Sequence, residues 1–201
     1  MPSVAEKKQN KRLRILDSAF ELFMQRSVNS TAIDDVVKAA GVAKGTFYLY
    51  FKDKYDLLNQ LIVNKSLGLL RAAYDEAFGD PAVPFELQML AFVNRIVDEL
   101  DRNHPFAALV EKNFSRCFQY ILNAEDPALR ASIDLLLDRM EENGIPRDRA
   151  LQTLYLITDL TGSVCFDAIV LQKPFSLPEI RPALNAAITA IIKEGGGAHD
   201  Q

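Results

Sequence analysis

The stretch that most constrains the fold of this chain is residues 31–54, TAIDDVVKAAGVAKGTFYLYFKDK. Its first half places apolar residues at helical spacing, and Gly41 then supplies the left-handed backbone that ends a helix and turns the chain. A second short helix carrying Lys44, Thr46 and Tyr48 follows the turn. Two helices joined by a tight glycine turn are typical of a helix-turn-helix, whose second helix enters the major groove of DNA.

The boundaries of the first helix follow from its polar residues. Thr31 is expected to cap this helix by accepting a hydrogen bond from the backbone N–H of Asp34. The carboxylates of Asp34 and Asp35 suit the positive end of a helix dipole. We therefore expect the helix to begin directly after Thr31.

The second helix has one inward face and one outward face. Phe47 and Phe51 are four residues apart, so both are expected to point into the core. Lys44, Tyr48 and Tyr50 then remain for the outer surface. This leaves basic and aromatic side chains available for contact with nucleic acid.

The run AAGVAKGTFYLYFKDKYDLL, preceded by the apolar helix RILDSAFELF, resembles the DNA-binding domain of tetracycline-repressor (TetR) type transcription regulators over about residues 12–61. The resemblance implies an all-α homodimer with two domains. Residues 9–69 would form the DNA-binding domain, with the helix-turn-helix at about 32–51. Residues 70–201 would form a helical domain for effector binding and dimerisation. It also implies a transcriptional regulator, more often a repressor, that leaves a palindromic operator when a small molecule binds.

The resemblance carries DNA-contacting roles onto matching positions. Lys44, Gly45 and Thr46 would face bases or adjacent phosphates, and Lys54 would lie at a helix start beside a phosphate. Gly45 would also let the helix backbone approach the groove closely. The expected DNA-binding residues are Thr31, Lys44, Gly45, Thr46, Tyr48, Tyr50 and Lys54.

Two positions depart from the family pattern. Ala32 stands where a phosphate-binding Thr or Ser is common, and Asp34 stands where a basic residue often reaches the groove. Asp34 could accept a hydrogen bond from a cytosine amino group. The alternative is that it only favours the start of its helix. Both departures put in doubt how much the first helix contributes to DNA affinity.

The charge distribution favours the N-terminal part as the DNA-binding part. Residues 1–60 carry 10 Lys and Arg against 7 Asp and Glu, whereas residues 61–201 carry 13 against 20. Residues 1–10 are interpreted as a flexible arm, which either contacts DNA backbone or is simply solvated. The net charge of −4 is therefore the sum of a net positive N-terminal part and a net negative remainder.

Several other classes of protein are disfavoured. We find no signal peptide and no run of the roughly 18 apolar residues that would span a bilayer, so a cytoplasmic protein with no membrane partner is expected. Cys117 and Cys165 lack metal-ligand spacing and are interpreted as reduced packing thiols rather than a disulfide or zinc site. No nucleophile with a base, carboxylate pair, metal site or phosphate loop is recognisable, so we expect no enzyme, metal or cofactor.

Beyond residue 54 the chain has only helical patterns. Helices are predicted from 54 to about 78, from 84 to 101, over 106–123 and from 126 to about 143. Further helices are predicted over 147–171 and after Ser176, where Glu179 could complete a capping box. Pro182 would either kink this last helix or mark its start.

The last two predicted helices are apolar nearly all round. A helix with two buried faces needs two partners, so one face is assigned to its own domain and the other to a second copy of the chain. The residues expected at this dimer interface are Leu154, Ile157, Val164, Ala168, Leu171, Leu184, Ile188 and Ile191.

Aromatic residues concentrate where the central helices can converge. An apolar cavity there, with a few polar groups, would suit a largely apolar effector. The expected pocket residues are Phe106, Val110, Phe114, Phe118, Tyr155, Thr158 and Asp159. Two alternatives stay open beside the repressor: an activator of the same family, and a helical small-molecule binding protein without DNA binding.

Overall fold

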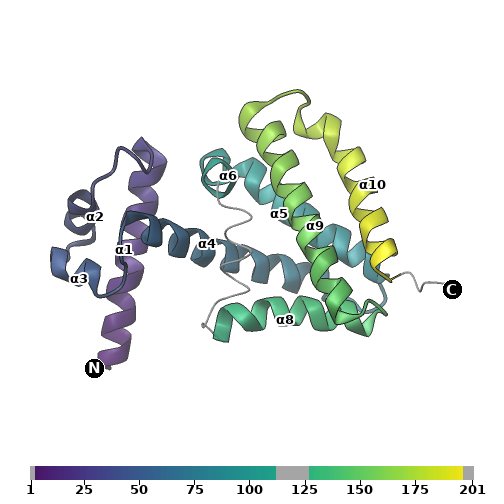
Figure 1. Ribbon diagram of the computed structural model, residues 1–201, viewed down its shortest axis with the longest axis horizontal. Helices are drawn as coiled ribbons and strands as arrows, with labels where there is room; N and C mark the ends of the chain where they lie inside the picture. The colour runs from purple at the N-terminus through teal and green to yellow at the C-terminus, as the bar shows by residue number, and fades with distance from the viewer. Residues whose placement is uncertain (1–2, 112–126, 197–201) are drawn as a thin grey trace. The chain divides into compact units, whose positions relative to one another are not determined.

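A computed structural model describes residues 3–111 and 127–196, which form helices and no strand. The chain divides into two compact units, Met1–Lys65, which we call the head, and Ser66–Gln201. The division falls inside the long helix α4 (Lys54–Ala77), so this one helix belongs partly to each unit. Figure 1 shows α1, α2 and α3 together in the first unit and the helices after α4 in the second.

Helix α1 (Val4–Arg26) begins much earlier than the sequence analysis expects. Ser3 caps it, and the Glu6 side chain accepts from the Ser3 backbone N–H. This reciprocal capping box satisfies two backbone donors at the helix start. The interpretation of residues 1–10 as a flexible arm is therefore wrong from Ser3 onward, because Ser-x-x-Glu at 3–6 is itself a helix-start signal.

Helices α2 (Ile33–Ala40) and α3 (Lys44–Tyr48) form the expected helix-turn-helix. Gly41 ends α2 with φ 61°, and a Cβ at this position would lie 2.7 Å from Nη2 of Arg14. The same guanidinium donates to the carbonyl of Ala40. The turn thus needs glycine for its left-handed backbone conformation, and a side chain here would also have to displace the end of Arg14.

The expected capping role of Thr31 is wrong. The residue before α2 is Ala32, whose backbone N–H donates to Asp35 Oδ2 at 3.3 Å. Thr31 instead donates its hydroxyl to the carbonyl of Ser27 at 2.8 Å and is buried. Because the Thr31 hydroxyl closes the α1–α2 loop, it is not available to the helix start.

The first unit encloses its own apolar core. Phe47 and Phe51 are 0% and 1% exposed, which confirms their inward orientation, and their ring centroids are 5.4 Å apart. The other buried apolar residues of this unit lie on α1, α2 and α4, and include Ile15, Leu16, Ala19, Phe23, Val36, Val37, Ala40, Leu57, Leu61 and Ile62. Since burying one Phe side chain is worth about 1.5–3 kcal/mol, this pair alone accounts for much of what fixes α3.

The second unit contains the end of α4 and a set of further helices. These are α5 (Phe85–Arg102), α6 (His104–Glu111), α8 (Pro127–Glu142), α9 (Arg147–Cys165), a π-helical turn η1 (Phe166–Leu171) and α10 (Leu177–Gly196). At the start of α4, the Asp53 carboxylate accepts hydrogen bonds from the backbone N–H groups of Tyr55 and Asp56 and so caps the helix. Of the helix predicted over 106–123, the part after Glu111 lies outside the described residues.

Helix α10 begins at Leu177, with Pro182 inside it. Glu179 Oε2 accepts from the backbone N–H of Ser176 at 2.8 Å and from its hydroxyl at 2.6 Å. These hydrogen bonds lower the pKa of the Glu179 carboxyl. The acidic half of the predicted capping box is therefore formed, and Pro182 does not mark the helix start.

Helix α9 contacts α5, α6, α8 and α10 and is the centre of the second unit. Arg147 at its start forms ion pairs with Asp134 and Asp138, which lie one turn apart on α8. At its other end the buried thiol of Cys165 has its pKa raised to about 12 by burial. Cys165 is free and buried, as expected for a packing thiol; Cys117 lies outside the described residues.

The segment Arg147–Leu171 is long and apolar enough to cross a membrane by length and composition alone. The sequence analysis missed this run. A core helix of a water-soluble domain passes the same test, and α9 has buried residues facing several neighbouring helices. The feature is therefore weak evidence for a membrane.

The expected dimer interface is largely inside the unit. Five of its residues are at most 6% exposed: Leu154, Ile157, Ala168, Leu184 and Ile188. They pack against the helices of their own domain, so they cannot contact a second copy in this conformation. Leu171 is 51% exposed, and Val164 and Ile191 are half-buried. Choosing between two apolar faces requires knowing where the other helices lie.

Candidate functional site

The outward face of α3 carries the candidate nucleic-acid interface. Lys44 and Gly45 are exposed, Tyr48 is 54% exposed and Leu49 is 75% exposed. No atom lies within 4 Å of a Cβ built on Gly45, so the space beside this glycine is open. A helix with small, basic and aromatic groups on its open side can approach a groove closely.

Lys44 is not alone on this surface. Its ammonium lies 2.8 Å from Oδ1 of Asp34, which joins the starts of α3 and α2. The hydrogen bond to Asp34 raises the pKa of the Lys44 ammonium. Both side chains are more than half exposed, so water weakens the pair and a phosphate or base can replace Asp34 as the partner.

Lys54 is engaged within the unit. Its ammonium donates to the carbonyls of Thr31 at 3.1 Å and Asn29 at 3.3 Å, and lies 5.9 Å from the ring centroid of Tyr55. These contacts tie the start of α4 to the α1–α2 loop. The phosphate contact expected of Lys54 stays a prediction, and it would compete with these hydrogen bonds.

The remaining expected DNA contacts differ in exposure. Thr46 and Tyr50 are half-buried, and the Tyr50 carbonyl accepts from the side chain of Gln60 at 3.4 Å. Thr31 is only 1% exposed, so its side chain is not on the surface, contrary to expectation. Leu49, next to Tyr48 in the chain, and Tyr55, next to Lys54, are 75% and 59% exposed and were not expected at this surface.

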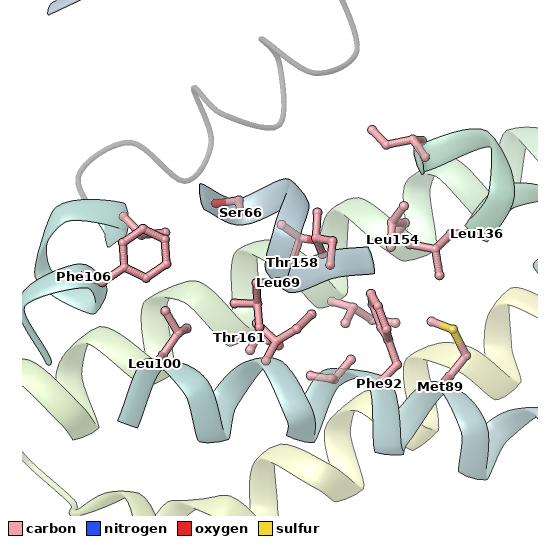
Figure 2. Close-up of a pocket in the computed structure, with 16 residues that line it drawn as sticks. Ser66, Leu69, Met89, Phe92, Leu100, Phe106, Leu136, Leu154, Thr158 and Thr161 are labelled. Atoms are coloured by element: carbon pink, nitrogen blue, oxygen red, sulfur yellow. The ribbon is translucent and has the colours of Figure 1, made fainter. Parts of the chain in front are cut away.

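An apolar pocket of about 130 Å³ lies within the second unit (Figure 2). Side chains from α4, α5, α6, α8 and α9 line it, and no charged side chain is among its described lining residues: Ser66, Leu69, Leu70, Met89, Phe92, Val93, Ile96, Leu100, Phe106, Val110, Ile133, Leu136, Leu154, Ile157, Thr158 and Thr161. Figure 2 shows Leu100 and Phe106 at one end, Met89 and Leu136 at the other, and Thr161 between them.

The sequence predicts the region of this pocket and only some of the residues that line it. Phe106, Val110 and Thr158 line the pocket as expected. Tyr155 is 42% exposed, Asp159 is exposed, and neither lines it, because the opposite face of α9 turns inward. The expected residues Phe114 and Phe118 lie outside the described residues.

The lining residues that the sequence did not predict lie mainly on α5 and α9. The predicted dimer residues Leu154 and Ile157 belong to the pocket face of α9, together with Thr161. Met89, Phe92 and Leu100 contribute the face of α5. A signal existed in the sequence, since Leu154, Ile157, Thr158 and Thr161 recur at helical spacing.

Thr161 is the unusual member of this wall. It is 4% exposed, and its Oγ1 atom has no hydrogen-bond partner within the part of the chain that the structure describes. The described part of the chain contains no group of three His, Cys, Asp or Glu side chains that could hold a metal ion. The pocket is thus suited to an uncharged, mainly apolar molecule.

Residues 15–61 match the family model described as bacterial regulatory proteins of the tetR family. The HTH-type transcriptional regulator AcrR of Shigella flexneri is 35% identical over 113 residues, which are 54% of this chain and 50% of that protein. The HTH-type transcriptional repressor KstR2 of Mycobacterium tuberculosis is 23% identical over 167 residues, 80% of this chain and 82% of the repressor. The chain therefore spans about half the length of the AcrR relative and more of the distant one.

Solved structures share the fold over nearly the whole chain. The repressor AlkX of a Dietzia strain has a TM-score of 0.62 at 18% identity, covering 91% of this chain and 95% of its own. The regulator FadR of Bacillus subtilis has a TM-score of 0.57 at 19% identity, covering 91% and 98%. Residues 15–61 therefore form a helix-turn-helix domain of the tetR family type, and the helices of the chain share the fold of these solved regulators.

Proposed function

We propose that this protein regulates transcription as a homodimer that binds a partially palindromic operator, and that a small, largely apolar effector releases it. Repression is the sign we favour, since distant relatives are named repressors. The observation that carries the proposal is the open face of α3, where Lys44, Gly45 and Tyr48 stand clear of the core formed by Phe47 and Phe51.

The effector part of the proposal rests on the pocket. Its wall is apolar and uncharged over the described lining, which favours hydrocarbon over polar metabolites. Bacillus subtilis FadR was solved in complex with stearoyl-CoA, and AlkX is a repressor implicated in biodegradation of n-alkanes. We propose the same broad class, molecules rich in hydrocarbon, for this chain.

We place the dimer contact on the outward faces of the last helices. Leu156 is 52% exposed on α9, and Leu171 and Phe175 are 51% and 53% exposed after it. Large exposed apolar residues favour protein contact where they join into a patch, and these three are the candidates along this part of the chain. A charge at Leu156 should therefore separate the subunits, whereas a charge at the buried neighbour Leu154 should unfold the domain. A dimer that stays intact with Leu156→Glu on sizing would place the contact elsewhere.

Selection of bound sites from random DNA by the purified protein tests the central claim. A dimer with two equal heads should enrich partial palindromes whose half-sites lie about 34 Å apart or somewhat more. Enrichment of single asymmetric sites would contradict the dimeric reading. Enrichment of no sequence at all would favour a helical ligand-binding protein without DNA binding.

Lys44→Ala tests which surface reads the DNA. It should change the preferred bases, or weaken binding and lower the salt dependence by about one unit if Lys44 contacts a phosphate. The matched control is Lys193→Ala, because Lys193 is an exposed lysine in the last turn of α10 in the second unit. Equal effects of the two substitutions would mean that net charge, and not α3, controls binding.

A further inference from the structure

The pocket contains one buried hydroxyl that its own helix does not satisfy. A threonine inside a helix commonly donates its hydroxyl to the carbonyl one turn earlier. The Oγ1 atom of Thr161 makes no such bond and no other within the described structure, although the residue is only 4% exposed. Unpaired buried polar groups are unfavourable and rare in native proteins, so each one requires a reason.

The surroundings of Thr161 do not favour an ordered water as that reason. A buried water typically makes about three hydrogen bonds. Of the 16 lining residues, all except Ser66, Thr158 and Thr161 are apolar. A bound molecule that is apolar along its length and polar at one point matches this wall better.

The dimensions of the pocket indicate the shape of that molecule. The lining runs along α5 from Met89 to Leu100, about 16 Å at the helical rise of about 1.5 Å per residue. The volume is about 130 Å³, close to the roughly 150 Å³ of an engineered cavity that holds benzene in another protein. A volume of this size holds a short molecule of roughly six to eight non-hydrogen atoms, and the row of lining residues along α5 favours a linear molecule over a fused ring system.

The electrostatics indicate that the molecule is uncharged at Thr161. No lysine, arginine or histidine is among the described lining residues. Against the described lining, a carboxylate placed beside Thr161 would be a buried charge with only neutral hydroxyl partners, which is strongly unfavourable. The Thr161 hydroxyl can donate one hydrogen bond, which suits a neutral carbonyl oxygen.

We propose that Thr161 is the polar anchor of the pocket, and that the effector is a short, linear, uncharged molecule that is hydrocarbon apart from one hydrogen-bond acceptor, such as a short-chain ester or ketone. The acceptor oxygen accepts a hydrogen bond from the Thr161 hydroxyl, and the hydrocarbon part lies along α5. This inference rests on the proposed function in taking the pocket as the effector site.

Calorimetric titration of the full-length protein tests the anchor with three probes of similar length: methyl pentanoate, heptane and hexanoate, each supplied as a cyclodextrin complex. Wild type should bind methyl pentanoate more tightly than the other two. Thr161→Val keeps the shape and removes the hydroxyl, so it should weaken methyl pentanoate binding about fivefold to tenfold. Heptane should bind this variant at least as well as wild type, because no hydroxyl is left unpaired.

Two matched variants separate anchoring from shape. Thr161→Ser retains the hydroxyl and should keep the preference for the ester over the alkane. Thr158→Val removes the neighbouring hydroxyl of the same wall and should change ester affinity less than twofold. The ligand-free melting temperature of Thr161→Val should equal or exceed that of wild type, because the lost hydroxyl had no partner; a lower melting temperature would show that the hydroxyl is structural.

The outcomes distinguish this inference from the proposed function. If Thr161→Val weakened ester and alkane equally, or if hexanoate bound best, the anchor would be overturned while an effector pocket could still control DNA binding. If the probes bound with the expected dependence on Thr161 but left operator affinity unchanged, the anchor would stand and the proposed release mechanism would fail. Absence of binding by all three probes would overturn the anchor.

Discussion

The open face of α3 and the pocket face of α9 differ in how their polar groups are used. On the head, Lys44 is paired with Asp34, and Lys54 donates to two loop carbonyls. In the pocket, the Thr161 hydroxyl has no partner in the described structure. A ligand of the head must therefore replace existing contacts, whereas a ligand of the pocket supplies a missing one.

This difference predicts opposite signs for substitutions. Exposed pairs exchange partners at small free-energy cost because water screens both states. A buried hydroxyl without a partner destabilises the empty protein. Weakening an existing pair on the head can improve binding, and removing the unpaired group in the pocket can improve folding.

The largest expected effect separates the two units. Phe47→Ala removes a side chain that is fully buried in the first unit and should destabilise that unit by about 3–5 kcal/mol. Hydrogen exchange followed by mass spectrometry should show faster exchange in α2 and α3, with α9 still protected, and operator binding should be lost. Loss of protection in α9 as well would show that the units unfold together.

A large side chain placed in the pocket should abolish the ligand response and leave DNA binding intact. Thr158→Trp introduces the only tryptophan of the chain into the pocket wall, at a stability cost of about 1–3 kcal/mol from overpacking. Operator affinity should be retained and the response to a bound hydrocarbon lost. The indole fluorescence reports whether the new side chain is buried. Release of DNA at the wild-type ligand concentration would place the effector site elsewhere.

The sequence predicts the head well because each of its short helices has a single apolar face. The four-residue spacing of Phe47 and Phe51 allows only one side of α3 to be buried, and Gly41 marks the turn. Thr31 was misplaced because a threonine before a helix can close a loop as well as cap a helix start. The contact with Ser27 that decides between them depends on where α1 ends.

The pocket could be predicted only in part because α9 is apolar on both sides. Leu154 and Tyr155 are adjacent, and the pattern alone does not show which of them faces the domain. Contacts with α5, α6, α8 and α10 decide, and these come from distant parts of the chain. The missing hydrogen bond of Thr161 has no sequence signal, since it depends on the local geometry of the folded helix.

A moderate effect is expected at the ion pair of the head. Asp34→Asn keeps the shape of the side chain, frees Lys44 and removes a negative charge from the face of α3. Operator affinity should rise severalfold, and the salt dependence should steepen by about one unit if Lys44 then pairs with a phosphate. Fluorescence anisotropy across a salt series measures both, with Asp17→Asn on α1 as a charge-matched control. Weaker and less selective binding would instead support a direct contact between Asp34 and a base.

The smallest effect is expected at Gly45, and its two readouts should move in opposite directions. A Cβ at this position meets no atom within 4 Å, so alanine fits the free head and should stabilise α3 by roughly 0.5–1 kcal/mol. If the backbone of α3 approaches DNA at Gly45, the added methyl should reduce operator affinity while the melting temperature rises. Gly68→Ala is the matched control, because its Cβ also meets no atom within 4 Å but it lies on α4 in the second unit. Unchanged operator affinity in a stabilised Gly45→Ala protein would show that α3 does not approach the groove closely at this residue.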